Sequence, residues 1–378
     1  MIYLDNSATT YFKPQIVKAS VIDAINNYTG NAGRSGHKIA LASGEKVMQT
    51  RQTVADFFDA SFDRVVFTHN CTTALNMAIL GSVEKGMHVI TTTMEHNSVL
   101  RPLNRLQENG DIELTIVSMN ADGCVSVDDI KSVVKPNTKL VVITQTSNVT
   151  GASNDVKAIG EFCHQNGIKI IVDCAQSAGH KKISMRTDNI DIICFAGHKG
   201  LYALTGIGGM VLADDVHLRP VILGGTGVDS ISLKQEELFP DNFESGTLPV
   251  MQIISLGAGV EYVNKNFEYI NNRIQNLTKY ALNRLKYLNN IKIYSNIDNC
   301  AGVISFNLNN CDCNDVANFL DKKYNIAVRS GLHCAPLIHK QLGTAEQGGA
   351  IRISLTHHNN ANEIDRLIDA LIDYQNSN

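Results

Sequence analysis

Between Asp63 and Leu212 the sequence alternates short apolar runs with amphipathic stretches of helical spacing. Short apolar runs predict buried strands, and the amphipathic stretches between them predict helices. The predicted strands are Val65–Thr68, His88–Thr92, Leu114–Val117, Leu140–Thr144, Ile168–Val172, Ile190–Phe195 and Gly209–Leu212. The predicted helices are Thr73–Val83, Val99–Gln107, Val127–Val133 and Val156–Asn166. This alternation predicts an α/β fold with a mainly parallel central sheet, whose ligand sites lie at the carboxyl ends of the strands.

The C-terminal third follows a different pattern. Apolar residues recur at helical spacing from Leu256 to Leu288 and predict one long helix. Beyond it we expect strands near Val303–Phe306 and Ala350–Ile353, and helices near Asp315–Lys323 and Glu363–Asp373. We therefore predict a large domain over residues 15–257, a smaller α+β domain over residues 258–378, and an N-terminal arm, residues 1–14, that packs with the small domain over the active site.

Size and charge narrow the classes of partner. The chain has 378 residues, 44% of them hydrophobic, which is enough to form the cores of two domains. The net charge of -4 gives no basic surface for nucleic acid or an anionic membrane. No apolar run approaches the roughly 20 residues that cross a bilayer, and the N-terminus does not resemble a signal peptide. We expect a cytoplasmic enzyme with a small-molecule substrate.

Cysteine usage also indicates a reducing compartment. The chain contains nine cysteines, an odd number, scattered along a sequence of enzyme size, which favours free thiols over a disulfide framework. Cys311 and Cys313 form the one close pair, and without neighbouring ligands this pair is a poor zinc site. We expect no bound metal.

Lys199 and Asp173 follow two of the predicted strands. Lys199 lies in the segment 196–200 after one strand, and Asp173 directly follows another. A lysine that can form a Schiff base, together with a carboxylate that can keep a pyridine nitrogen protonated, is the minimal equipment for pyridoxal 5′-phosphate (PLP) chemistry. Each residue alone would be interpreted as a surface lysine or a capping aspartate. The pair predicts an enzyme.

Further polar residues are expected at the same edge of the sheet. Thr72 and Thr73 open a predicted helix, where free backbone N–H groups bind phosphate, although a threonine there also serves as an ordinary helix cap. His96 follows another strand and is a candidate for stacking on a cofactor ring and relaying protons. Gln176 and Asn148 are candidate hydrogen-bonding partners of the cofactor.

The segment 329–336 is polar and is punctuated by glycine and proline, so it predicts an exposed loop rather than a strand or helix interior. It contains Cys334, with Arg329 and His333 nearby. These neighbours favour thiolate character, and a thiolate can attack a sulfur atom. A half-buried structural thiol is the alternative. Arg352 can form a fork to the carboxylate of an amino-acid substrate.

Together these residues resemble the class V aminotransferase fold (PLP fold type I), and within it the cysteine desulfurase and selenocysteine lyase group. The match runs nearly end to end, including the opening motif at residues 3–10 and the segment 31–37 that contains Arg34 and His37. The resemblance implies the following roles: Lys199 for the Schiff base beside His198, Asp173 and Gln176 for the pyridine and phenolate contacts, His96 for ring stacking, Thr73 for the phosphate, Thr247 for the phosphate of a second subunit, Cys334 for the persulfide, and Arg352 for the substrate carboxylate. Asn148, Arg329 and His37 complete the predicted substrate site.

Some positions depart from this family pattern. Ala196 lacks a hydroxyl that many relatives use for the phosphate, and Ala74 replaces a common glutamate. Cys71 and Ser7 replace small residues, and Leu248 stands where proline is usual. These changes affect cofactor binding and substrate choice, whereas the residues for breaking a carbon–sulfur bond are retained.

The resemblance implies conversion of L-cysteine to L-alanine, with a persulfide formed on Cys334. The short spacing from Cys334 to Arg352 resembles the second type of desulfurase, which works as a homodimer with a separate sulfur-acceptor protein; the sulfur would serve iron–sulfur cluster assembly or a similar pathway. The alternatives are a selenocysteine or cystine lyase on the same scaffold, an ordinary aminotransferase, and a catalytically quiet PLP-binding or sulfur-relay protein.

Overall fold

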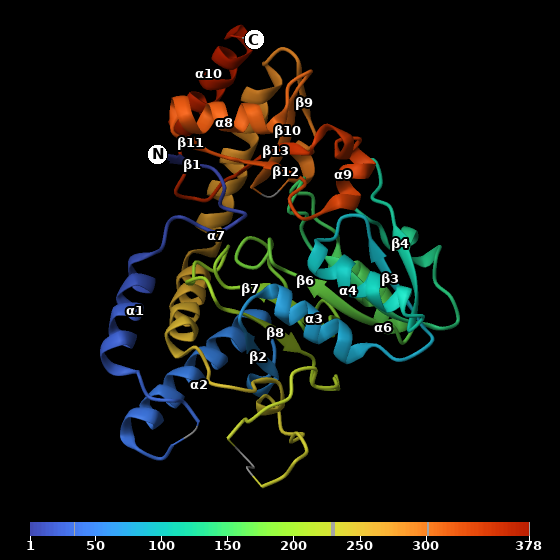
Figure 1. Ribbon diagram of the computed structural model, residues 1–378, viewed down its shortest axis with the longest axis vertical. Helices are drawn as coiled ribbons and strands as arrows, with labels where there is room; N and C mark the ends of the chain where they lie inside the picture. Colours follow the sequence, from blue (N-terminus) through green and yellow to red (C-terminus); the bar gives the residue numbers. More distant parts are fainter. Residues whose placement is uncertain (34, 228–230, 301, 378) are drawn as a thin grey trace.

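The computed structural model describes residues 1–378 apart from 34, 228–230, 301 and 378 (Figure 1). Its large sheet has seven strands in the order β2-β8-β7-β6-β5-β3-β4. Their bounds are β2 Val65–Thr68, β3 Met87–Thr92, β4 Ile112–Val117, β5 Thr138–Thr144, β6 Lys169–Asp173, β7 Ile192–Ala196 and β8 Gly208–Leu212. The strands from β7 to β4 pair in parallel, and β8 pairs antiparallel with both β7 and β2. The predicted α/β fold with a mainly parallel sheet is confirmed.

Register places the carboxyl ends of the central strands side by side. Asp173, the last residue of β6, is paired with Thr144 of β5 on one side and with Cys194 of β7 on the other. Because parallel strands all end at the same edge, the turns after β5, β6 and β7 meet there. Lys199 lies in the turn that follows β7.

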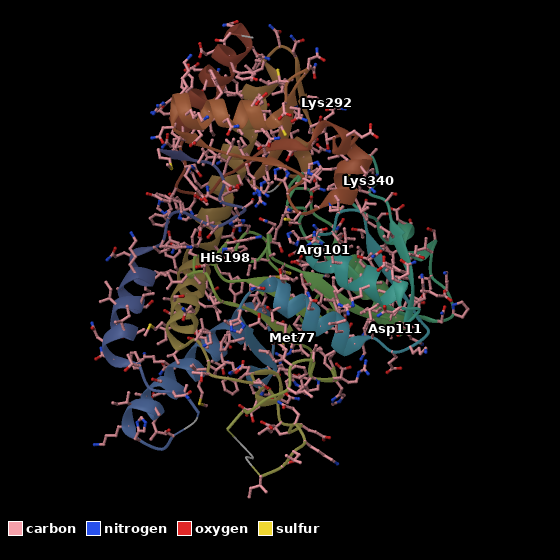
Figure 2. The ribbon with its side chains drawn as sticks, viewed as in Figure 1. Met77, Arg101, Asp111, His198, Lys292 and Lys340 are labelled. Carbon is pink, nitrogen blue, oxygen red and sulfur yellow. The ribbon has the colours of Figure 1, made fainter. Side chains whose placement is uncertain are left out.

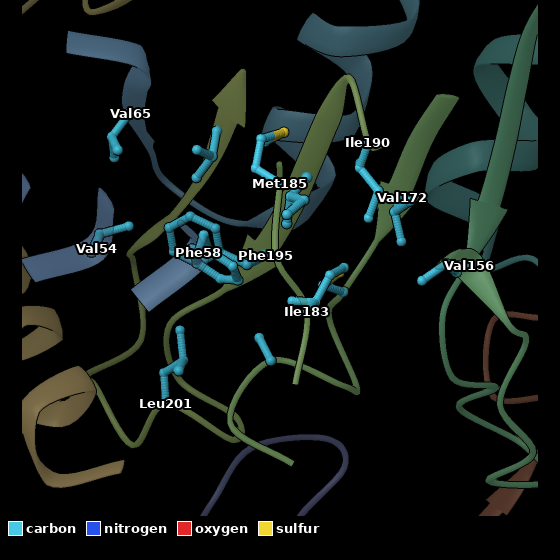
Figure 3. Close-up of a cluster of buried hydrophobic side chains, with 14 of the residues drawn as sticks. Val54, Phe58, Val65, Val156, Val172, Ile183, Met185, Ile190, Phe195 and Leu201 are labelled. Atoms are coloured by element: carbon cyan, nitrogen blue, oxygen red, sulfur yellow. The ribbon is translucent and has the colours of Figure 1, made fainter. Parts of the chain in front are cut away.

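Helices cover both faces of the large sheet. They are α1 Gln15–Asn27, α2 Lys38–Phe58, α3 Cys71–Ser82, α4 Asn97–Glu108, α5 Val127–Lys131 and α6 Val156–Gln165. On one face Phe58 of α2 packs against Phe195 of β7 with ring centroids 5.2 Å apart, within a larger buried apolar cluster (Figure 3). On the other face Leu75 of α3 and Val99 of α4 belong to a second cluster. Burial of such side chains contributes about 1.5 to 3 kcal/mol each.

The long helix α7, Val250–Lys286, runs from the large sheet into the C-terminal region (Figure 1). There a second, antiparallel sheet has the order β12-β13-β10-β9. Its strands are β9 Ile291–Ile293, β10 Val303–Leu308, β12 Arg329–Gly331 and β13 Ala350–Ser354. The accompanying helices are α8 Cys313–Tyr324, α9 Pro336–Leu342 and α10 Ala361–Ser377, and short 3₁₀ turns lie at 62–64, 241–243, 297–299 and 345–347. This region has its own apolar core. The exact domain boundaries stay a prediction.

The N-terminal arm is joined to both regions. Strand β1, Ile2–Tyr3, pairs in parallel with β11, Ile326–Ala327, in the C-terminal region. Further along, the Thr10 hydroxyl donates to the carbonyl oxygen of His198 at 3.0 Å. Residues 2–10 therefore connect the C-terminal region to the turn that carries Lys199.

The structure differs from the sequence prediction in several places. Segment 329–336 is not simply a loop, because β12 pairs residue by residue with β13, Arg329 opposite Arg352. Its pairing partner is a strand about 20 residues further along the chain, and the polarity of the segment itself does not reveal such a partner. Helices α1 and α2 were not predicted; α2 leaves large apolar residues such as Ile39 and Leu41 exposed, which blurs its amphipathic pattern. Within the described residues, no helix has both the length and the apolar character that a membrane span requires.

Candidate active site

A cavity of about 250 Å³ lies at the carboxyl edge of the large sheet, beneath the C-terminal region. Figure 2 shows His198, one of its lining residues, near the centre of the molecule. The predicted site residues that line it are Thr72, His96, Asn148, Asp173, Gln176, His198, Lys199, Arg329 and Arg352. A larger open cleft of about 670 Å³, between the end of α2 and the middle of α7, contains none of the predicted residues.

Lys199 has the electrostatic environment that a nucleophilic amine needs. Burial lowers the pKa of its ammonium group, and the nearby Asp173 carboxylate only partly opposes this shift. A lowered pKa increases the share of neutral amine at physiological pH, and the neutral amine is the form that condenses with an aldehyde.

Asp173 is buried at the end of β6 and is held by two neighbours. Its Oδ1 atom accepts a hydrogen bond from the Ala175 N–H at 2.8 Å and contacts the Cys71 thiol at 3.5 Å. Burial, and then the Asp173 charge, raise the pKa of the Cys71 thiol well above its usual value. The thiol is therefore protonated and donates to the carboxylate, so Cys71 provides Asp173 with an extra donor.

The start of α3 forms the opposite wall of the cavity. Asn70 is the N-cap, and its Oδ1 accepts from the Thr73 N–H at 2.9 Å, so neither threonine caps the helix. The Thr73 hydroxyl is 3.2 Å from the same Asn70 oxygen, and Thr73 does not line the cavity. Thr72 does, and its hydroxyl is 2.7 Å from that of Ser98. The first N–H groups of a helix have no intrahelical acceptors, so this wall suits an anion.

His96 is neutral at physiological pH. Burial lowers the pKa of its imidazole, and the positive charges of Lys199 and Arg329 add to this effect while Asp173 opposes it. Its Nδ1 atom accepts from the Ser98 N–H at 3.0 Å, so the ring proton is on Nε2. A neutral, oriented imidazole on the cavity wall suits stacking against a planar ring.

Cys334 is exposed, as predicted, and Arg329 is its cationic neighbour, with Nη2 4.0 Å from the sulfur. His333 does not have the expected role beside the thiol. Its ring is buried and lies 3.2 Å from His339, and burial together with the Arg352 charge lowers its pKa to about 2. A neutral, inward-facing ring adds no positive charge near Cys334, so the prediction for His333 was wrong.

The backbone at Cys334 adopts an uncommon conformation. His333 and Cys334 have successive positive φ values of 49° and 57°, a left-handed pair that costs energy for residues with a Cβ. Hydrogen bonds of 2.7 Å compensate, since the Asn97 N–H donates to the Cys334 carbonyl oxygen and Asn148 Nδ2 donates to that of His333. The thiol is thus presented by a restrained turn.

Arg352 is almost fully buried, with 1% of its surface exposed. Its Nη2 pairs with Asp5 Oδ1 at 2.8 Å, and its Nη1 donates to the Asn148 carbonyl oxygen at 3.1 Å. Its Nε atom is buried and has no acceptor. The guanidinium therefore has an unused donor for a further carboxylate.

Besides Thr73 and Cys334, two more of the predicted residues do not line this cavity. Thr247 and His37 are exposed, and His37 is the N-cap of α2. Arg34 lies outside the described residues. Gln176 lines the cavity, but its Nε2 donates to the Ser7 carbonyl oxygen of the arm at 3.1 Å.

Several lining residues were not predicted, namely Ser7, Ala8, Asn70, Leu75, Ser98, Thr144 and Thr146. Chain position could have identified some of these residues. Ser98 lies two residues after His96, and Thr144 is the last residue of β5.

The cavity fits PLP. It brings together a lysine with a lowered pKa, a carboxylate and the start of a helix. The buried His198 Nδ1 atom also lacks a partner, as an atom that faces a bound group would. Among the described residues there is no cluster of three or more potential metal ligands.

Comparison with known proteins places this geometry in a family. The class-V aminotransferase family matches residues 2–367. A probable cysteine desulfurase from Methanothermobacter thermautotrophicus is 35% identical, over 98% of this chain and 94% of its own length. A cysteine desulfurase from Haloferax volcanii is 30% identical over 98% of this chain and 88% of its own. The apo structure of a cysteine desulfurase from Thermococcus onnurineus superposes with a TM-score of 0.93 at 30% identity, covering 100% of this chain and 95% of that one. The chain therefore belongs to the class-V aminotransferase family, among relatives that are cysteine desulfurases.

Proposed function

We propose that this protein is a PLP-dependent cysteine desulfurase that converts L-cysteine to L-alanine and retains the sulfur as a persulfide on Cys334. The observation that carries the proposal is the single cavity that joins Lys199, Asp173 and Arg352, with the Cys334 turn beside it. Enzymes of this family use PLP. The resemblance to desulfurases supports the choice of cysteine as substrate.

Each residue has a physical task in this proposal. PLP, when bound, supplies an electron sink for the bonds at the substrate's Cα. Lys199 holds the cofactor through its neutral amine, and Asp173, with a donor from Cys71, pairs with the pyridine nitrogen. The N-terminus of α3 and Thr72 bind the phosphate. His96 stacks on the ring, and Arg352 orients the substrate carboxylate.

Cys334 is proposed as the sulfur acceptor. Its thiolate attacks the substrate sulfur, and an S–S bond forms while the substrate C–S bond breaks. The electron pair of the C–S bond stays with carbon, and a proton completes L-alanine. The Arg329 guanidinium lies beside Cys334, with Nη2 4.0 Å from the sulfur.

Replacement of Cys334 by alanine tests this role. The Cys334→Ala variant should keep the absorbance of bound PLP and lose alanine formation from L-cysteine by at least about 100-fold, because the nucleophile is missing. Cys311→Ala, which removes another partly exposed thiol, is the matched control and should turn over normally. Mass spectrometry of alanine gives the readout, and undiminished turnover by the Cys334 variant would refute the assignment.

Replacement of Lys199 by alanine tests the cofactor attachment. The purified variant should lack the visible absorbance of covalently held PLP, because no other amine lines the cavity within the described residues. Absorbance spectra before and after borohydride treatment give the measurement. A variant that keeps a reducible band would place the attachment elsewhere.

A selenocysteine lyase on the same scaffold is the second candidate, and the position of Cys334 favours it. Cys334 does not line the cavity, whereas Lys199 and Arg352 do. Selenium leaves carbon more readily than sulfur does, so such an enzyme could dispense with the thiol. Alanine formation from selenocysteine by Cys334→Ala would support this candidate.

We also propose a homodimer that delivers sulfur to a separate acceptor protein in the cytoplasm. Thr247 and His37 are exposed, and α2 displays apolar side chains with more than half of their surface exposed, Ile39 at 54%, Leu41 at 60% and Met48 at 57%. Exposed apolar groups of this kind support an interface between subunits. The exposure of Cys334 supports access by an acceptor, and nine free thiols support a reducing compartment.

A further inference from the structure

The carboxylate of Asp5 already occupies part of the site proposed for the substrate carboxylate. Its Oδ1 lies 2.8 Å from Arg352 Nη2, and the two residues are 347 positions apart in the chain. We propose that Asp5 sets the affinity of this site for carboxylates: it is an internal carboxylate that shares Arg352 and weakens the binding of every ligand that uses an α-carboxylate. This inference rests on the proposed function.

The arm holds Asp5 in place beside Arg352. The Leu4 N–H donates to the Ala327 carbonyl oxygen at 2.9 Å, and the Leu4 carbonyl oxygen accepts from the Ser354 N–H at 2.6 Å. On the other side, the Ser7 N–H donates to the Ser354 hydroxyl at 2.8 Å. Ser354 is the last residue of β13, the strand that contains Arg352. Hydrogen bonds of the backbone on both sides of Asp5 therefore hold it beside Arg352.

Arg352 is only partly occupied. Asp5 uses one donor of Nη2 and the Asn148 carbonyl uses one of Nη1, while Nε is buried without an acceptor. A guanidinium has five N–H donors, so a second carboxylate can bind while the first stays. Asp5 therefore does not block the site. Its negative charge repels the incoming carboxylate and offsets the positive charge of the Arg352–Arg329 pair, which face each other across β12 and β13.

The consequence for turnover follows from the chemistry of substrate and product. L-Cysteine and L-alanine both have an α-carboxylate, so a contact to that group binds both equally and contributes nothing to the chemical step. A weaker shared contact lets alanine leave sooner. Asp5 would thus raise the dissociation constant of L-alanine and the KM for L-cysteine by a similar factor.

The test compares two substitutions of Asp5. Asp5→Asn removes the charge and keeps an oxygen acceptor for Arg352, whereas Asp5→Ala removes both. We expect Asp5→Asn to bind L-alanine roughly five- to tenfold more tightly, measured by calorimetry, and to lower the KM for L-cysteine by a similar factor with little change in kcat. Binding of ethylamine, which has no carboxylate, should not change. Asp23→Asn, on the exposed face of α1, is the surface control.

The outcomes separate this inference from the proposed function. Unchanged or weaker L-alanine binding by Asp5→Asn would overturn the inference, because Asp5 would then act only to orient Arg352. A melting curve shows whether each variant is folded, and Asp5→Glu, which keeps the charge, should bind L-alanine no more tightly than the wild type. If the wild type forms no alanine from L-cysteine, the proposed function fails, yet the comparison of L-alanine affinities still tests Asp5.

Discussion

At the scale of single residues, the most unusual group outside the proposed chemistry is Glu95. It precedes His96, has no exposed surface, and accepts hydrogen bonds at Oε1 from the Thr92 hydroxyl at 2.6 Å and the Thr144 N–H at 3.0 Å. Its Oε2 is buried without a partner. Burial raises the pKa of Glu95 to about 8 in spite of these two donors. The folded protein therefore holds a proton at neutral pH that the unfolded chain releases.

This proton makes stability depend on pH with a definite sign. Between the ordinary value of 4.5 and about 8, the folded state binds more protons at Glu95 than the unfolded state does. The free energy of unfolding should therefore fall as pH rises through this interval, by up to about 5 kcal/mol. Glu95→Gln, which is neutral at every pH, should be the more stable protein at pH 8 and should lose this part of the slope. Urea titrations at pH 5, 6.5 and 8 give the measurement, and parallel curves for the two proteins would contradict the assignment.

The sequence predicts only in part which side chains lie at the candidate site and what each one contacts. Lys199, Asp173 and His96 line one cavity because parallel strands bring their carboxyl ends together, and Arg352 reaches the same cavity from β13 of the antiparallel sheet. The ends of strands do not predict in which direction a given side chain points. His333 was expected beside the thiol and instead faces His339, a choice made by packing in the C-terminal region.

At the scale of secondary-structure elements, α7 packs very closely against the turn that carries Lys199. A Cβ atom at Gly259 of α7 would overlap the carbonyl oxygen of Leu201, which allows only glycine there. In contrast, a Cβ at Gly44 of α2 would meet its nearest neighbour, Gly33 N, at 3.9 Å. The two glycines therefore have different physical reasons to be present in helices.

These two positions form a matched pair of predictions. Gly44→Ala should stabilise the protein by roughly 0.5 to 1 kcal/mol, since alanine is the better helix former and finds space. Gly259→Ala should destabilise it by about 1 to 3 kcal/mol, because backbone must move to relieve the overlap. Thermal unfolding of the two variants measures both effects. A stabilised Gly259→Ala protein would show that α7 and the Lys199 turn can separate at little cost.

Element positions were the most predictable part of the fold. The strands β2 and β8 lie within one residue of their predicted bounds, because runs of buried apolar residues are local signals. Strands β4 and β5 begin two residues earlier than predicted, at Ile112 and Thr138, and so include polar positions such as Glu113. The pairing of β12 with β13 could not be predicted, because its three residues have no apolar pattern.

At the scale of the whole molecule, the proposed dimer makes a prediction about mass. If α2 forms part of the interface, Leu41→Glu should shift the protein from dimer to monomer, because a buried, unpaired charge at an interface is costly. Multi-angle light scattering should then report half the wild-type mass. Tyr287→Glu, at the far end of α7 and 86% exposed, is the control and should remain a dimer. A wild-type protein that is already monomeric would refute the proposal, and a dimeric Leu41→Glu variant would place the interface away from α2.

The sequence by itself determined the α/β class, most of the central strands, and the meeting of Lys199 and Asp173 at one sheet edge. These depend on local hydrophobic patterns and on the rule that parallel strands end together. Only the tertiary structure decided that Asp5 pairs with Arg352, that Cys71 donates to Asp173, and that Thr72 rather than Thr73 faces the cavity. The physical reason is that these contacts join distant segments or depend on a helix's exact rotation, and neither leaves a pattern among sequence neighbours.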